Sequence, residues 1–103
     1  MTVPQQGEIW WAETEDKRRP VLVITRSQAI QALRRVVVAP VSRTVRGIPT
    51  EIALGPSEGL AGDCAASFDN LQTILRSALT DKTGTLGPRG HEICETLRAL
   101  ADC

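Results

Sequence analysis

The sequence predicts a mainly β domain of the α+β class, in which a small, strongly bent antiparallel sheet or barrel carries one C-terminal helix. Five short runs rich in strand-forming residues follow one another, separated by polar or glycine-containing turns. The last part of the chain instead has apolar residues at helical spacing. With 103 residues, the chain is long enough for one domain, residues 1–103, with a core of its own.

The first two strands are expected to form a hairpin. "GEIWWAE", Gly7–Glu13, alternates so that Trp10 and Trp11 point to opposite faces, and at most one of them is fully in the core. The other would offer a flat surface for stacking a base, although simple barrel packing explains it equally well. "RPVLVIT", Arg19–Thr25, is an apolar run that fits a strand buried on both faces.

The next stretch predicts a helical turn and a third strand. "SQAIQALR", Ser27–Arg34, has the pattern of a capped turn, and "RVVVAPVS", Arg35–Ser42, has that of a strand. Because Pro40 has no N–H to donate to a ladder, we expect a bulge or a sheet edge there. Ser42 then lies at or just past the end of the strand, near a rim.

Two more strands and a helix complete the chain. "IPTEIALG", Ile48–Gly55, alternates as a fourth strand, and "CAASFDNLQTI", Cys64–Ile74, is a fifth. In the final stretch Pro88 suits the first helical turn, and apolar residues follow at spacings of four and three. These apolar residues are Ile93, Leu97 and Leu100. The pattern predicts an amphipathic helix that caps the sheet.

The formal net charge of zero hides a segregation of charge along the chain. From Lys17 to Arg46 there are eight cations and no acid, whereas the remaining residues carry four cations and twelve acids. Seven of the eight cations are arginines, which suit forked contacts to phosphate. A polyanion is therefore an expected partner of this segment, and solvated strand ends and turns are the alternative interpretation.

The cysteines and the hydropathy pattern exclude several classes of protein. Cys64, Cys94 and Cys103 show no CxxC or Cys/His ligand spacing, so the sequence predicts neither a disulfide framework nor a metal site. No stretch approaches the ~20 apolar residues that a membrane helix needs. We therefore expect reduced thiols, no metal or other cofactor, no membrane segment and a cytoplasmic location.

The order of six segments resembles the MazF/PemK family of toxin endoribonucleases over nearly the whole chain. The segments are "GEIWWAE", "RRPVLVIT", "VVVAPVS", "TEIAL", "DCAASFDNLQT" and "LGPRGHEICETLRAL". The resemblance implies an SH3-like barrel of about five to seven strongly bent antiparallel strands with short helices and a C-terminal amphipathic helix. It also implies a homodimer that cuts single-stranded RNA at short sequence motifs without metal, leaving a 2′,3′-cyclic phosphate and a 5′-hydroxyl.

The implied partner is a cognate antitoxin of a type II toxin–antitoxin system, whose disordered tail folds over the RNA groove. Cleavage by such a toxin would inhibit translation and growth. The RNA motif, the target RNA and the antitoxin are not specified by the sequence.

The resemblance assigns catalytic roles to Arg19, Ser42 and Asp69. Arg19 matches the family's arginine immediately before the proline, where Pro20 fixes the backbone. Ser42 matches the family's catalytic hydroxyl, usually a threonine, and keeps a donor for the scissile phosphate. Asp69 matches an acidic position implicated in base contacts or proton transfer. Alternative interpretations are a surface cation at Arg19, a turn-forming hydroxyl at Ser42 and an arginine salt bridge at Asp69.

Six further residues are candidates for RNA contacts. They are Lys17, Arg18, Arg26 and Arg43 on phosphates, Trp11 by stacking, and Asn70 of "DNLQT". Neutralising about four phosphates would give a log–log salt slope near −3. The single histidine, His91, rules out exchange between two imidazoles, and its place near the start of the final helix favours a plain surface role.

The chain also departs from the family pattern. Its short connection "TEDK" lacks the Gly-Ser-Glu-Gln element that other members commonly have, and Ser67 and Gln72 stand where other members have arginines. The recognised RNA sequence is therefore expected to differ. Two alternative functions share the same barrel: a CcdB-type toxin that binds gyrase, and a catalytically silent RNA- or partner-binding module. The basic segment and the R-P-V-L-V motif favour cleavage.

Overall fold

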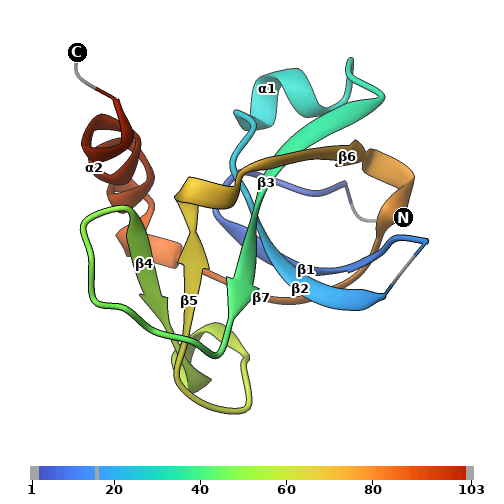
Figure 1. Cartoon of the computed structure of the whole chain (residues 1–103). Coiled ribbons are helices and arrows are strands. Elements are labelled where there is room, and N and C mark those ends of the chain that lie inside the picture. Colours follow the sequence, from blue (N-terminus) through green and yellow to red (C-terminus); the bar gives the residue numbers. More distant parts are fainter. Residues whose placement is uncertain (1–2, 16, 102–103) are drawn as a thin grey trace.

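The computed structural model describes residues 3–15 and 17–101, which form one antiparallel sheet curled on itself with a helix against its side (Figure 1). Cys103 and Asp16, the latter within the short connection "TEDK", lie outside the described residues. The strands are β1 (Glu8–Glu13), β2 (Arg18–Val23), β3 (Arg35–Ser42), β4 (Glu51–Leu54), β5 (Cys64–Ser67), β6 (Gln72–Leu75) and β7 (Leu79–Thr85).

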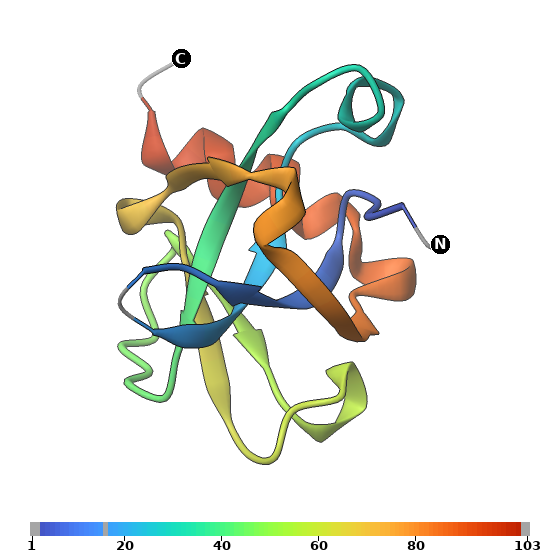
Figure 2. The same cartoon turned by 90° about the vertical axis from the view of Figure 1, so that its right-hand side faces the viewer.

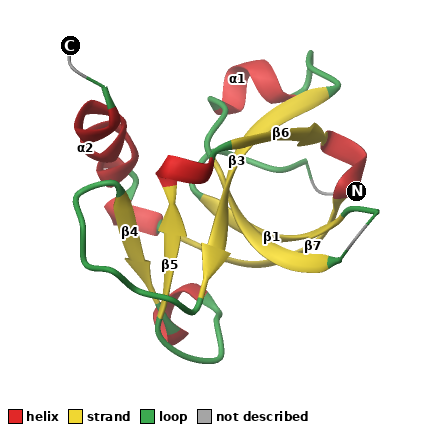
Figure 3. Ribbon diagram, in the orientation of Figure 1, coloured by secondary structure: helices red, strands yellow, loops and turns green. Residues whose placement is uncertain are grey.

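Two α-helices and four 3₁₀ turns lie between and after the strands (Figure 3). They are α1 (Ser27–Ile30), α2 (His91–Leu100), η1 (Pro56–Glu58), η2 (Phe68–Asn70), η3 (Arg76–Ala78) and η4 (Gly87–Arg89). The mainly β class, the strongly bent antiparallel strands and the C-terminal helix are confirmed. Within residues 3–15 and 17–101, no helix has the length and apolar character needed to cross a bilayer.

Strand β3 is the centre of the sheet, whose order is β4-β5-β3-β2-β1-β7 with β6 also paired to β3. On one side β3 pairs with β2. On the other side its first half, Arg35–Val38, pairs with β6, and its last residues, Val41 and Ser42, pair with β5. Pro40 lies between these two partners, inside a strand that keeps regular register with β2. Pro40 therefore has a partner strand on the β2 side alone, so the predicted edge is present locally, without a bulge in the register with β2.

Two apolar cores cover the two faces of the β1–β2–β3 sheet. One includes Phe68 and, from α2, Ile93, both 1% exposed. The other includes Trp10 and Val38, and Figure 2 shows the sheet between the two cores from a second side. Trp11 is half-buried on the face opposite to Trp10, so the prediction that the two rings separate is confirmed.

The fifth predicted strand, Cys64–Ile74, is broken into β5 and β6 by the turn η2. At this turn Phe68 enters the core, and its backbone N–H donates to the carbonyl of Thr50 at 2.9 Å. Before this turn β5 pairs with β4, and after it β6 pairs with the first half of β3. The fourth strand is also shorter than the predicted Ile48–Gly55, because only Glu51–Leu54 pairs with β5.

Strand β7, which pairs with β1 from Glu8 to Ala12, was not predicted from the sequence. Its segment "LTDKTGT" has a single large apolar residue, Leu79, and most of its other side chains are exposed. Without a buried alternation the segment resembles a polar loop. Its three threonines, which favour strands, were the only available signal.

Both helices begin differently from the predictions. Pro88 lies in η4, one turn before α2, so it is not in the first turn of the helix. The N-cap of α1 is Arg26, and no side chain caps this helix. Ser27 instead accepts a hydrogen bond from the backbone N–H of Gln6 at 2.9 Å, which fixes the N-terminal segment. The amphipathic nature of α2 is confirmed, since Ile93 is buried and Leu97 packs against the same core. Leu100, at the end of the predicted apolar face, is instead 39% exposed.

Candidate functional site

Arg19 and Ser42 lie on the same face of the sheet, one on β2 and the other on β3. The β2–β3 ladder ends at the pair Val21 and Pro40, and the two strands diverge beyond it (Figure 1). Arg19 comes two residues before Val21, and Ser42 comes two residues after Pro40. Because side chains alternate along a strand, both residues share the face of that last pair, and each Cα lies about 7 Å along its strand from it.

Ser42 is exposed at the last position of β3, so its predicted place at a strand end is confirmed. Its Oγ accepts a hydrogen bond from the backbone N–H of Thr44 at 3.1 Å, which is the turn-forming contact of the alternative interpretation. A hydroxyl that accepts one bond still has its proton to donate. The turn therefore orients the Ser42 side chain and leaves its O–H available for a ligand.

Asp69 and Asn70 lie on η2, away from Arg19 and Ser42. The carboxylate of Asp69 accepts a hydrogen bond from the Thr50 hydroxyl at 2.6 Å. Within residues 3–15 and 17–101, no arginine lies within ion-pair distance of Asp69. Ser42 pairs with Ala65, four residues before Asp69, which corresponds to roughly 10 Å along the sheet. The structure of one chain does not bring Asp69 next to the Ser42 hydroxyl.

Arg18 and Trp11 lie on the opposite face of the β1–β2 hairpin from Arg19. The carbon of the Arg18 guanidinium lies 4.5 Å from the centroid of the Trp11 ring. Its Nη2 lies 2.8 Å from the Asp81 carboxylate, and its Nε lies 3.3 Å from that of Glu13. Arg18 is therefore fully engaged within the chain, which the prediction of a phosphate contact did not anticipate.

The remaining predicted phosphate contacts fall at two distant places. Lys17 and Arg43 are exposed, next to Arg18 and Ser42 in sequence. Arg26 is exposed at the start of α1, at the other end of β2. It lies seven residues after Arg19, which corresponds to about 20 Å for an extended chain. The eight cations of the basic segment thus do not form a single surface around Arg19.

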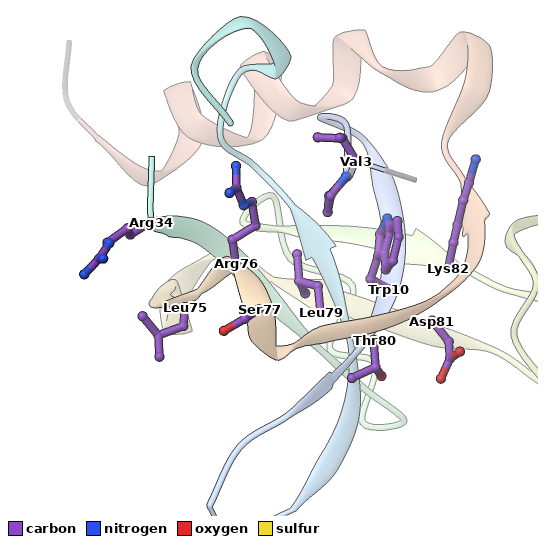
Figure 4. A pocket seen from close by; sticks show the side chains of 11 residues that line it. Val3, Trp10, Arg34, Leu75, Arg76, Ser77, Leu79, Thr80, Asp81 and Lys82 are labelled. Atoms are coloured by element: carbon purple, nitrogen blue, oxygen red, sulfur yellow. The ribbon is translucent and has the colours of Figure 1, made fainter. Parts of the chain in front are cut away.

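A groove of about 880 Å³ lies over the core that contains Trp10, and the sequence analysis missed it. Figure 4 shows its apolar floor, with Trp10 and Leu79, between Arg34 and Arg76 toward one end and Lys82 toward the other. Arg76 donates to the backbone carbonyl of Ile30 at 2.8 Å, so it holds η3 against α1. Most of these residues come from η3 and β7, which the sequence did not predict.

Glu8 binds Lys82, the charged residue at one end of this groove. Its carboxylate accepts hydrogen bonds from the backbone N–H of Gln5 at 2.8 Å and from the Trp10 indole at 3.0 Å, and Lys82 lies 2.8 Å away. Burial opposes ionisation of this carboxyl, but the bonds from Lys82, Trp10 and Gln5 outweigh burial and hold the pKa of Glu8 below its usual value. Glu8 therefore fixes the start of β1 as a charged, fully bonded group.

The described residues, 3–15 and 17–101, include no group of three or more histidine, cysteine, aspartate or glutamate side chains that could hold a metal ion. His91 is exposed at the first position of α2, with its Nδ1 3.2 Å from the carbonyl of Pro88. Cys64 is buried and Cys94 is exposed, and both are free thiols. The two predicted catalytic groups at the diverging ends of β2 and β3 are thus a guanidinium and a hydroxyl.

Comparison with known proteins gives one family and consistent relatives. Residues 5–101 match the family described as PemK-like, MazF-like toxin of type II toxin–antitoxin system. The chain is 41% identical to probable endoribonuclease MazF2 of Mycobacterium tuberculosis, over 96% of this chain and 99% of that protein. It is 38% identical to probable endoribonuclease MazF5 of the same species, over 98% of this chain and 95% of that protein.

Solved structures agree with the sequence relatives. The Mycobacterium tuberculosis toxin MazF-mt6 superimposes with a TM-score of 0.81 at 35% identity, covering 89% of this chain and 93% of that one. A mycobacterial endoribonuclease, solved in complex with its cognate antitoxin, has a TM-score of 0.79 at 27% identity, covering 93% of this chain and 92% of that one.

Proposed function

Because this chain belongs to the PemK-like, MazF-like family of toxins of type II toxin–antitoxin systems and is thus an endoribonuclease, we propose that it cleaves single-stranded RNA without a metal ion. Cleavage occurs at short sequence motifs and leaves a 2′,3′-cyclic phosphate and a 5′-hydroxyl. The observation that carries this proposal is the placement of Arg19 and Ser42 on one face, where β2 and β3 diverge.

The two side chains supply what the phosphate needs in this reaction. The 2′-hydroxyl loses its proton to water as its oxygen attacks phosphorus. The bond from phosphorus to the 5′-oxygen then breaks, and this oxygen takes up a proton from water. Negative charge accumulates on the phosphorane oxygens in between. The Arg19 guanidinium has forked donors that match these oxygens. The Ser42 O–H donates to the same phosphate, since its oxygen is already oriented by Thr44. Pro20 fixes the backbone beside Arg19 and so limits where the guanidinium can go.

Asp69 and Asn70 are proposed to contact a base of the RNA. The separation of roughly 10 Å from Ser42 favours this role over proton transfer within one chain. The Asp69 carboxylate can accept a hydrogen bond from a base amine, and the Asn70 amide can both donate and accept. Lys17 and Arg43 are exposed beside the diverging strands and are proposed to hold flanking phosphates.

The wider biology of the chain is proposed on the same basis. We infer a single domain over residues 1–103 that acts as a homodimer in the cytoplasm and inhibits translation and growth. A cognate antitoxin with a disordered tail is its proposed inhibitor. Support comes from the mycobacterial endoribonuclease described above, which was solved together with its antitoxin.

The test is cleavage of a long single-stranded RNA in EDTA, with mapping of the cut sites and end groups. The wild-type chain should cut at a recurring short motif and leave 5′-hydroxyl ends. Arg19→Ala should lose cleavage by at least about 100-fold, because a donor to the transition-state charge is removed. Arg98→Ala, which removes an exposed arginine on α2, is the matched control and should cut normally.

Intact RNA in EDTA with the wild-type chain would contradict the metal-independent mechanism. Equal loss of cleavage in Arg19→Ala and Arg98→Ala would contradict the role of Arg19. Thermal melting of both variants shows whether each is folded.

A further inference from the structure

Four side chains from three strands form a cluster on the face of the β1–β2 hairpin opposite to Arg19. Trp11 pairs with Asp81 across β1 and β7, and Glu13 pairs with Arg18 across β1 and β2. The Arg18 guanidinium lies over the Trp11 ring, 4.5 Å from its centroid. The two carboxylates hold it there, Asp81 at 2.8 Å and Glu13 at 3.3 Å. We call these four residues the hairpin cluster.

The hairpin cluster carries a net negative charge, because one guanidinium meets two carboxylates. In this state Arg18 does not attract a phosphate, since its positive charge is already compensated. Its side chain nevertheless remains 44% exposed, with Glu13 at 58% and Asp81 at 65%. Exposed ion pairs of this kind contribute little to stability and exchange readily with solvent. The Arg18 side chain can therefore move off the Trp11 ring at little cost in stability.

The Trp11 ring is the group that a single-stranded RNA would use here. An aromatic face stacks any base, and the same face is what Arg18 occupies in the free protein. The ring lies on the opposite side of the hairpin from Arg19, so it belongs outside the cleavage site.

We propose that Trp11 stacks one flanking base of the RNA substrate, and that Arg18, held by Asp81 and Glu13, competes with this base for the ring. Arg18 and Asp81 are then positioning residues that set how tightly the flanking nucleotide binds. This inference rests on the proposed function, because the ligand is the single-stranded RNA substrate itself. It assigns Arg18 a role opposite to that of a phosphate contact, and the two roles predict opposite effects.

The test is a pair of substitutions that leaves the net charge unchanged. Arg18→Gln together with Asp81→Asn removes the guanidinium that lies over Trp11 and one of the two carboxylates that bind it. The RNA therefore meets the same net protein charge as in the wild type. The control is Arg98→Gln together with Glu95→Gln, a charge-balanced pair at exposed positions on α2. Binding is measured by fluorescence anisotropy with a labelled RNA that carries the mapped cleavage motif and 2′-O-methyl groups, which block the attacking 2′-oxygen.

We expect the Arg18→Gln/Asp81→Asn variant to bind this RNA about 3- to 10-fold more tightly than the wild type, within the range that stacking of one base supplies. The control pair should match the wild type. Adding Trp11→Leu to the first pair should cancel the gain. Tryptophan fluorescence should fall on RNA binding in the first pair and fall less when Trp11 is replaced, while the buried Trp10 provides the constant background.

Equal or weaker binding by the Arg18→Gln/Asp81→Asn variant, with normal melting, would overturn the inference and return Arg18 to the role of a phosphate contact. A gain that persists with Trp11→Leu would also overturn it, because the gain would then not come from the ring. Cleavage by the wild-type chain in EDTA tests the proposed function separately. If the wild type neither cleaves nor binds RNA, the proposed function fails and this inference fails with it.

Discussion

Ser42 shows how one side chain meets a structural and a chemical requirement together. Its oxygen accepts the Thr44 N–H at 3.1 Å, which closes the turn after β3, and its proton remains free to donate. Sequence reasoning treated the turn and the catalytic hydroxyl as alternatives. The geometry makes them compatible, because an oxygen that accepts one hydrogen bond from the backbone is held in place and can still donate its own proton.

We expect Ser42→Ala to lower the rate of the chemical step by about 100- to 1000-fold, the usual effect of removing one donor to a developing oxyanion. Ser42→Thr should stay within about tenfold of the wild type, since it keeps the donor. Single-turnover cleavage of the mapped motif measures both. Full activity in Ser42→Ala would show that the hydroxyl serves only the turn.

A second prediction at the scale of one residue concerns the charge of Glu8. Its pKa is held below the ordinary value of 4.5, so its stabilising contribution is complete above about pH 4.5 and is lost as the pH falls through the lowered, folded-state pKa. Glu8→Gln should therefore cost about 1–2 kcal/mol of unfolding free energy at pH 7, because the charged partner of Lys82 is lost.

The check is urea unfolding of the wild type and Glu8→Gln at pH 7 and at pH 3. The difference between the two proteins should shrink at pH 3, where the wild-type carboxyl loses its charge. Glu15→Gln, at an exposed position, should show no difference at either pH. An undiminished difference at pH 3 would mean that packing, and not charge, carries the effect.

At the scale of elements, the contact of β7 with η1 fixes the edge of the sheet. A Cβ added to Gly84 would lie 1.9 Å from the backbone oxygen of Glu58, and one added to Gly59 would lie 2.0 Å from the backbone oxygen of Thr83. The two backbones therefore touch, and only glycine allows this approach. The same turn is anchored by Arg89, whose Nη1 lies 3.3 Å from the buried Glu58 carboxylate.

Arg89 connects three elements through one guanidinium. It donates to the carbonyl of Ala53 on β4 at 2.8 Å and binds Glu92 on α2 at 2.6 Å, in addition to Glu58 on η1. The Arg89 hydrogen bond outweighs burial and holds the pKa of Glu92 below its usual value. The C-terminal helix is thus fixed to the β4–β5 edge by charge as well as by Ile93.

Gly84→Ala should destabilise the domain by about 3 kcal/mol or more, because two backbone segments must separate to admit the methyl group. Gly62→Ala is the matched control, since its added Cβ would meet no atom within 4 Å. Thermal unfolding compares the two variants. A melting temperature of Gly84→Ala equal to that of Gly62→Ala would show that η1 and β7 move apart without cost.

On the scale of the whole molecule, folding divides the basic segment that is continuous in sequence. The β1–β2 hairpin tip and the C-terminal helix lie on opposite sides of the molecule (Figure 1). Arg18 is neutralised by Asp81, which is distant in sequence, and Arg26 lies at the far end of β2. The cations left near the proposed cleavage site are Lys17, Arg19 and Arg43.

The dependence of RNA affinity on salt concentration reports how many cations of the basic segment contact phosphates. Three phosphate contacts predict a log–log slope of about −2 for a single strand, in place of the value near −3 that the sequence alone suggested. Anisotropy titrations with the 2′-O-methyl RNA over a range of salt concentrations give the slope. A slope near −3 would mean that further cations reach the RNA.

Local patterns were sufficient to predict much of this fold. The hairpin, β3 with Ser42 at its end, and the amphipathic α2 all followed from alternation, apolar runs and helical spacing. The break at η2 and the strand β7 did not follow. The chain turns at Phe68 because its ring is buried in the core and its N–H donates to the Thr50 carbonyl. Strand β7 pairs with β1 although its own residues have almost no apolar pattern.

The sequence by itself determined the family, the mainly β fold class and the choice of Arg19 and Ser42 as candidate catalytic residues, because these depend on residue type and short spacing. Only the tertiary structure decided which candidates lie together. It placed Arg19 and Ser42 on one face, left Asp69 and Arg26 apart from them, and paired Arg18 with Asp81 over Trp11. The physical reason is that strand register and the twist of the sheet join residues from distant parts of the chain, and no local pattern encodes those partners.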